Sequence, residues 1–150
     1  MTGLQVVLLV VGILAVQVMI WVPVVLWIRR RTARVEEGLR GELAASGERV
    51  RLGPVAASYR GATPGSGLPA VKGNAVAALT DRRLIVRRLV GEAIELAVAE
   101  IASVRDDRWF LGSYRGGRPV VIVKTRAGAE LGVMVAEHEA WMSALRPPAS

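Results

Sequence analysis

The single histidine and one pair of adjacent aspartates are the side chains best suited to acid-base chemistry in this sequence. His138 lies between Glu137 and Glu139 in a segment that we expect to be helical, and a solvated helix face explains all three. Asp106 and Asp107 are neighbours in an expected strand, where successive side chains point to opposite faces. They cannot act as a paired acid and base while the strand is continuous. We expect them to mark a turn or bulge.

Metal, thiol and phosphate-loop chemistry lack the residues that they need. The sequence has 0 cysteines and 1 histidine, which removes the nucleophile of thiol chemistry and the ligands of the usual zinc sites. Residues 65–67 (Gly-Ser-Gly) lack the lysine of a phosphate-binding loop and precede a strand instead of a helix. We therefore expect a protein that is not an enzyme and that holds no metal or cofactor.

A group of arginines near an expected hairpin tip is the first candidate binding surface: Arg82, Arg83, Arg87 and Arg88. Each basic residue close to anionic lipid adds about 1 kcal/mol of attraction. The alternative is a solvated hairpin whose arginine stems cover apolar surface.

An aromatic group is the second candidate: Trp109, Phe110 and Tyr114. These side chains cannot all face the inside of a small barrel, because successive strand residues alternate between faces. An outward member would contact a partner or a membrane, unless the linker helix or the closing helix covers it.

An apolar run from Leu4 to Ile28 contains no charged residue and predicts a membrane anchor. At about 1.5 Å per residue it can cross a bilayer core of roughly 30 Å, whereas a signal-peptide core is about half as long. Residues suited to the membrane interface lie near its end: Trp21, Trp27, Arg29, Arg30, Arg31 and Arg34. Because loop arginines are retained in the cytoplasm, we expect a single-pass inner-membrane protein with its N-terminus outside.

The basic charge is largely explained by the membrane. Of the formal net charge of +7, four charges are the juxtamembrane arginines. No aromatic platform alternates with a basic stripe, so we expect no nucleic-acid partner. Membrane lipid and a protein partner remain. A second copy of the chain could pair through Gln17 in the bilayer, or through the apolar stripe of a short linker helix, although that stripe is too short to predict a coiled coil: Val35, Leu39 and Leu43.

Beyond Gly47, short β-branched runs separated by Gly, Pro and Asp predict an antiparallel barrel or sandwich. The expected strands are residues 54–60, 73–80, 83–90, 92–96, 101–110, 118–125 and 129–134. Residues 94–104 also fit one face of a helix, so both assignments stay open there. Residues 135–146 predict a closing helix with Trp141 and Leu145 facing inward.

Residues 73–86, Gly-Asn-Ala-Val-Ala-Ala-Leu-Thr-Asp-Arg-Arg-Leu-Ile-Val, resemble the second and third strands of bacterial pleckstrin-homology-like (PH-like) and GRAM-like domains. In those domains Leu-Thr-Asp ends one strand and Arg-Leu begins the next. Residues 94–104 are similar to the next strand and the entry to the fifth, and Trp141 sits where the family's C-terminal helix plugs the barrel. The resemblance implies a seven-stranded antiparallel barrel closed by a C-terminal helix.

The family consists mainly of binding modules for lipids, peptides or neighbouring domains, and the fold alone does not decide which. Members that bind phosphoinositides place basic residues around the first two strands, where this chain has only Arg60 and Lys72. We expect an adaptor or accessory subunit that holds a partner at the membrane. The alternative is a surface module that binds anionic lipid. The expected segments are an anchor (1–28), a basic linker helix (29–47), a PH-like domain (48–146) and a tail (147–150).

Overall fold

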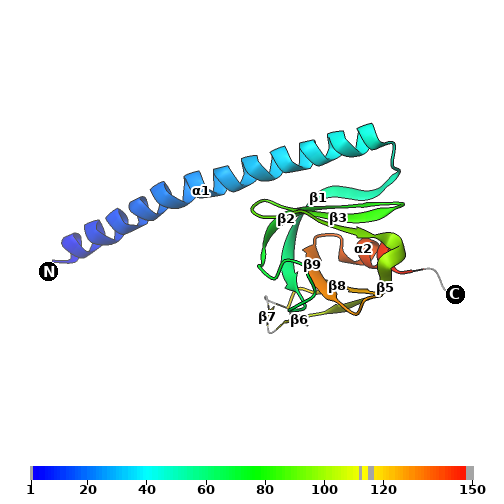
Figure 1. Cartoon of the computed structure of the whole chain (residues 1–150). Helices are drawn as coiled ribbons and strands as arrows, with labels where there is room; N and C mark the ends of the chain where they lie inside the picture. Colours follow the sequence, from blue (N-terminus) through cyan, green and yellow to red (C-terminus); the bar gives the residue numbers. More distant parts are fainter. Residues whose placement is uncertain (1, 112, 115–116, 148–150) are drawn as a thin grey trace. The chain divides into compact units, whose positions relative to one another are not determined.

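The computed structural model describes residues 2–111, 113–114 and 117–147, without the side chains of 113 and 114. These residues form two compact units that divide between Arg34 and Val35. The elements, labelled in Figure 1, are α1 (Gly3–Ser46), β1 (Val50–Ala62), β2 (Gly73–Thr80), β3 (Arg83–Arg88), β4 (Ile94–Ala97), the 3₁₀ helix η1 (Val98–Glu100), β5 (Ile101–Asp107), β6 (Trp109–Phe110), β7 (Ser113–Tyr114), β8 (Val120–Thr125), β9 (Glu130–Val135) and α2 (His138–Leu145).

The first unit is the apolar part of α1. This helix is long and apolar enough to cross a membrane, and its most apolar stretch has no side chain buried by the rest of the chain. A signal sequence near an N-terminus has the same length and composition. The helix continues through Pro23, and the guanidinium of Arg31 lies 5.6 Å from the ring centre of Trp27.

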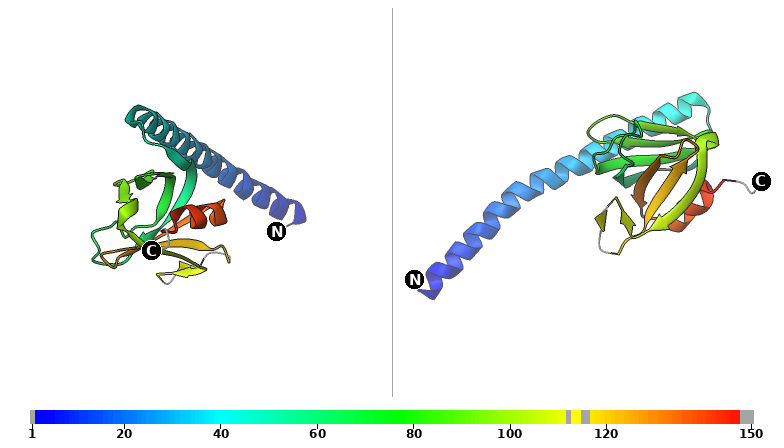
Figure 2. Two further views of the ribbon diagram at one scale, coloured as in Figure 1. Left: turned by 90° about the vertical axis from the view of Figure 1, so that its right-hand side faces the viewer. Right: turned by 60° about the horizontal axis from the view of Figure 1, so that its bottom comes forward.

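The second unit is built on one curled antiparallel sheet of seven strands in the order β4-β3-β2-β1-β9-β8-β5. The seven expected strands are therefore confirmed as the members of this sheet. The expected closed barrel is not: the two edge strands, β4 and β5, are not hydrogen-bonded to each other in the described residues. Strand β4 is only 4 residues long, and α2 lies beside β5 within the curl (Figures 1 and 2). The sheet is a half-closed barrel.

The ambiguous segment 94–104 contains both of the expected structures in sequence, because β4 and β5 are joined by the single turn of η1. The expected strand 101–110 breaks after Asp107, whose Oδ1 accepts a hydrogen bond of 3.1 Å from the backbone N of Trp109. Asp107 thus marks the turn that we predicted, whereas Asp106 remains within the strand. Beyond this break, β6 and β7 form a separate two-stranded hairpin.

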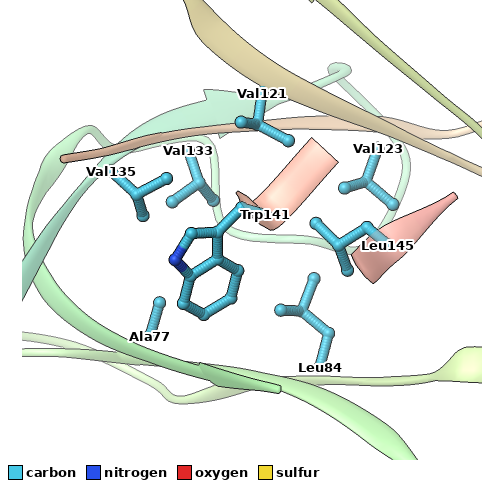
Figure 3. A pocket seen from close by; sticks show the side chains of 8 residues that line it. All are labelled: Ala77, Leu84, Val121, Val123, Val133, Val135, Trp141 and Leu145. Carbon is cyan, nitrogen blue, oxygen red and sulfur yellow. The ribbon is translucent and has the colours of Figure 1, made fainter. Parts of the chain in front are cut away.

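The inner face of the curl is closed by α2. Trp141 and Leu145 are buried as predicted, with exposed fractions of 3% and 5%. The helix begins at His138, three residues later than expected, because Val135 belongs to β9 and pairs with Ala57. Figure 3 shows the indole of Trp141 between Ala77 and the valines of β8 and β9. The remaining cavity, about 10 Å³, is close to the volume of a single water probe.

The outer face of the sheet is apolar in two places, and each is covered by a different segment. Leu39 and Leu43 of α1 pack on a cluster from β2 and β3: Val76, Ala78 and Ile85. Phe110 of β6 packs on a cluster from β8 and β9: Val120, Ile122 and Met134. The stripe of the linker helix, considered above for self-association, is therefore occupied by the chain's own sheet.

We predict that Leu43→Ala lowers the free energy of unfolding of the second unit by about 2–5 kcal/mol, because it removes a fully buried side chain. Thermal and chemical unfolding of the full chain in detergent would measure the loss. Arg40→Ala, at a side chain that is 62% exposed, is the control and should change stability by less than about 1 kcal/mol. Equal effects of the two substitutions would contradict the packing of α1 on β2 and β3.

Candidate functional site

An open groove of about 760 Å³ lies at β1 and the end of β9, and its lining includes residues from both faces of the sheet. Its floor is mostly small or apolar: Ala56, Ala57, Met134, Val135 and Ala136. Its polar lining comes from separate segments: Ser58, Asn74, Arg118 and His138. Strand β1 lies between β2 and β9 in the sheet, and the groove combines its outward Ala56 and Ser58 with Ala57 and Val135, which also pack against the inner core. It is large enough for a short peptide segment or a small molecule.

The groove exists because the middle of β1 carries small residues on the outside. Ala56 and Ser58 pair across to Val76 and Asn74 of β2, and Ser58 also pairs with Met134 of β9. The outward side chains of β1 here, those of alanine and serine, are short. The longer side chains of the neighbouring strands therefore form the walls of the groove. Sequence analysis did not identify this site, because alternation marks Ala56 and Ser58 as outward but does not show that nothing covers them.

His138 is not the solvated helix residue that we expected. Its side chain is only 15% exposed, and its Nε2 lies 2.8 Å from Oδ2 of Asp106 in β5. This contact ties the first residue of α2 to an edge strand. Nδ1 is buried and has no hydrogen-bond partner among the described residues. The carboxylate beside Nε2 favours a proton on that nitrogen, which makes Nδ1 an acceptor in the neutral ring.

Ser58, His138 and Asp106 together have the residue types of a hydrolytic triad. The geometry that activates a serine requires its hydroxyl to hydrogen-bond to the histidine. Within the described residues no such bond joins Ser58 to His138. The described part of the chain also contains no group of three or more His, Asp or Glu side chains placed to hold a metal ion.

Three of the four arginines predicted to contact anions are engaged by the protein itself. Arg83 forms ion pairs with Glu48, at 3.0 Å, and with Glu95, at 2.9 Å. Arg87 lies 2.6 Å from Oε2 of Glu42. The hydrogen bond that Arg83 donates to Glu48 raises the pKa of Arg83, and the hydrogen bond from Arg87 lowers the pKa of Glu42.

Arg88 donates to the backbone oxygens of Glu92 and Val71, each at 3.1 Å, while Arg82 is exposed. The pairs made by Arg83 and Arg87 connect the end of α1 and the start of β1 to β3. These two arginines therefore hold the sheet to the segment that covers it.

The aromatic group divides as strand alternation predicts. Trp109 is 57% exposed and Phe110 is 5% exposed. The prediction of Phe110 as a contact residue is therefore wrong: its side chain packs on the outer-face cluster of β8 and β9, and it belongs to no cluster with the linker helix or the closing helix. The side chain of Tyr114 lies outside the described part of the chain. In the first unit, Trp21 and Trp27 are 61% and 54% exposed.

Tyr59 is a buried polar residue that sequence analysis did not single out. Its side chain is fully buried on the inner side of β1, and its hydroxyl donates a 2.5 Å hydrogen bond to the backbone oxygen of Pro69. The guanidinium of Arg88 lies 5.9 Å from its ring centre. Burial raises the pKa of Tyr59 to about 12, against the opposing effect of Arg88. The bond fixes the long β1–β2 loop to the core.

Comparison with known proteins supports the fold and goes no further. No family model and no curated protein matches this sequence. Among solved structures, the chain is similar to a crystal structure of the C-terminal domain of an unknown protein from Leishmania infantum, with a TM-score of 0.50 and 15% identity. The match covers 74% of this chain and 94% of that domain. At this identity the likeness shows a shared fold alone.

We predict that the stability of the second unit falls as the pH rises from about 10 to about 12, in part through Tyr59. The ordinary pKa of tyrosine is about 10, so in this window the unfolded chain loses the proton that the folded chain keeps. Tyr59→Phe should flatten this part of the curve of unfolding free energy against pH. Parallel curves for the two proteins above pH 10 would contradict the assignment, because all other titrating groups are shared.

A second prediction concerns the contact that holds the β6–β7 hairpin. A Cβ at Gly132 would lie 2.5 Å from Cδ1 of Phe110 and 3.0 Å from Cγ1 of Val120. Gly132→Ala should therefore destabilise the protein, by about 1–3 kcal/mol as for other overpacked sites. In a Phe110→Ala background the same substitution should cost clearly less, and a double-mutant cycle measures the difference. Equal costs in both backgrounds would show that the ring does not lie over Gly132.

Proposed function

We propose that the chain is a single-pass membrane protein that presents a PH-like binding module, and that this module acts as a non-enzymatic adaptor for a membrane-associated protein. The observation that carries the proposal is the groove over β1, which is open and bordered by polar groups, while the interior of the curl is filled by Trp141. A ligand would therefore bind in this groove and not inside the curl.

The membrane assignment rests on α1. Its apolar part offers no surface that the rest of the chain covers, and a soluble protein rarely exposes so large an apolar area. The arginines that follow it favour a cytoplasmic location for the second unit. The continuation of α1 into the packed linker, with Leu39 fully buried, supports a retained anchor over a leader that is removed, since its last turns belong to the folded unit.

The PH-like assignment draws on three features together. The residues that resemble the family, 73–86, form the β2–β3 hairpin. The sheet has seven antiparallel strands, and the C-terminal helix places Trp141 against the inner face. The open seam between β4 and β5 is where the chain differs from a closed barrel.

The groove favours a peptide segment that carries an acidic side chain. Arg118 is exposed at its rim, and Asn74 and Ser58 offer hydrogen-bonding groups above an apolar floor. The arginines near the β2–β3 hairpin give less support to the alternative, a module for anionic lipid, because Arg83 and Arg87 are already paired with glutamates.

Site-directed photo-crosslinking in the full chain, in its native membrane, tests the adaptor proposal. A photoreactive residue at Ala56, on the groove floor, should give one discrete protein adduct, and the same residue at Ala127, in the exposed β8–β9 turn, should not. Arg118→Glu should reduce the Ala56 adduct about tenfold, since a hydrogen bond to a charged group contributes about 1.5–3 kcal/mol. Arg146→Glu, at another exposed arginine, is the matched control and should leave it unchanged.

The outcomes separate the two functions. Equal adducts from Ala56 and Ala127, or an adduct that is insensitive to Arg118→Glu, would contradict the groove as a partner site. Adducts to lipid alone would favour the lipid-binding module.

A further inference from the structure

We propose that the β6–β7 hairpin is a second membrane contact, in which Trp109 and Leu111 insert into the headgroup region of the bilayer to which α1 anchors the chain. The inference rests on the anchoring part of the proposed function and is independent of the groove. It is carried by the exposure, the backbone geometry and the support of this hairpin.

The tip of the hairpin presents two large apolar side chains to solvent. Trp109 is 57% exposed and Leu111 is 47% exposed. Phe110, between them, is buried at 5% and anchors the hairpin to β8 and β9. Phe110 thus packs on the sheet while the residues on either side of it remain largely exposed.

Leu111 occupies a backbone conformation that does not suit it. Phe110 pairs directly with Ser113, and Leu111 follows Phe110 at the end of β6. Its φ is +49°, and among the described residues it is the only one other than glycine with a positive φ. A positive φ favours Asn, Asp or Gly. A strained leucine whose side chain stays half exposed gains little for the fold, which points to a contact made outside it.

The surroundings fit a lipid interface. Arg108 precedes the tip and is exposed. On the other side, a Cβ at Gly61 would lie 3.6 Å from Cδ1 of Leu111 and 3.0 Å from the backbone oxygen of Ala70. Leu111 therefore lies beside the β1–β2 loop, where the next residues are Val71, 72% exposed, and Lys72, also exposed. Tryptophan with aliphatic side chains and flanking cations is the composition that membrane interfaces select.

Because α1 tethers the domain to the bilayer, the insertion of only two side chains is sufficient to hold its orientation. A stable protein interface buries about 800 Å² on each partner, far more than two side chains supply. The second unit begins 7 residues after Ile28, so the tether between the apolar run and the domain is short. An anchored domain meets the bilayer at a high effective concentration, so a weak insertion that would fail for a free domain can hold its orientation.

Quenching of tryptophan fluorescence by brominated lipid tests the inference on the full chain in vesicles of brominated phosphatidylcholine and phosphatidylglycerol. The chain has 4 tryptophans. With Trp21→Phe and Trp27→Phe, emission comes from Trp109 and from Trp141, which is buried inside the curl and serves as the unquenched reference. We expect the brominated lipid to remove the Trp109 share of the emission, and the further change Trp109→Phe to abolish the quenching.

Leu111→Gly separates a contact from a structural role. Glycine relieves the strained φ, so the melting temperature should stay the same or rise, while quenching of Trp109 should fall severalfold. A drop in melting temperature with unchanged quenching would show that Leu111 serves the fold, and would overturn the inference.

Two further variants distinguish failure of the hairpin from failure of the anchor. Trp109→Phe with Trp21 and Trp27 intact reports on α1 alone. Strong quenching there, with none at Trp109, would leave the anchor in place and overturn the hairpin contact. No quenching of Trp21 and Trp27 would overturn both. Arg82→Trp, in a chain in which Trp21, Trp27 and Trp109 are all replaced by phenylalanine, probes the β2–β3 turn. Quenching at this position, with none at Trp109, would show that the side of the domain that carries the arginines faces the membrane. That result would overturn the inference.

Discussion

The structure depends on strands that are apolar on both of their faces. In β2, β3, β8 and β9 successive residues are buried with little interruption, although in a curled sheet only alternate side chains can point into the core. The other half must be covered from outside. The end of α1 covers β2 and β3, the β6–β7 hairpin covers β8 and β9, and the small outward residues of β1 between them leave the groove. The position of the candidate site is thus a result of how the outer face is protected.

Sequence reasoning located the strands because hydrophobic pattern and turn residues are local signals. It also identified the inward role of Trp141 and the need for an outward member among the aromatic residues, which follow from helical and strand periodicity, but it did not show that Trp109 is that member and that Phe110 is buried. It failed where the outcome depends on which distant segment lies on which surface. His138 was expected to be solvated because its neighbours in sequence are acidic, but its environment is set by Asp106, 32 residues earlier.

The same limit applies to the arginines. A cluster of cations in the sequence is equally consistent with a ligand surface and with internal ion pairs. Glu42 and Glu48 lie some 40 residues from the arginines that they neutralise, so their partnership cannot be read from spacing. The groove was missed for a related reason, since an uncovered surface is defined by what does not pack on it.

The packing of residues 35–46 on the sheet restricts how this domain can be separated from its helix. A protease that cut after Ser46 would remove Leu39 and Leu43 and leave Val76, Ala78 and Ile85 bare on the outside of β2 and β3. The released fragment would expose an apolar strand surface of the kind that drives aggregation. A cut between Ile28 and Val35 would leave the covering helix with the domain. The arginine-rich stretch is therefore the point at which helix and domain can be separated without uncovering the outer face of β2 and β3.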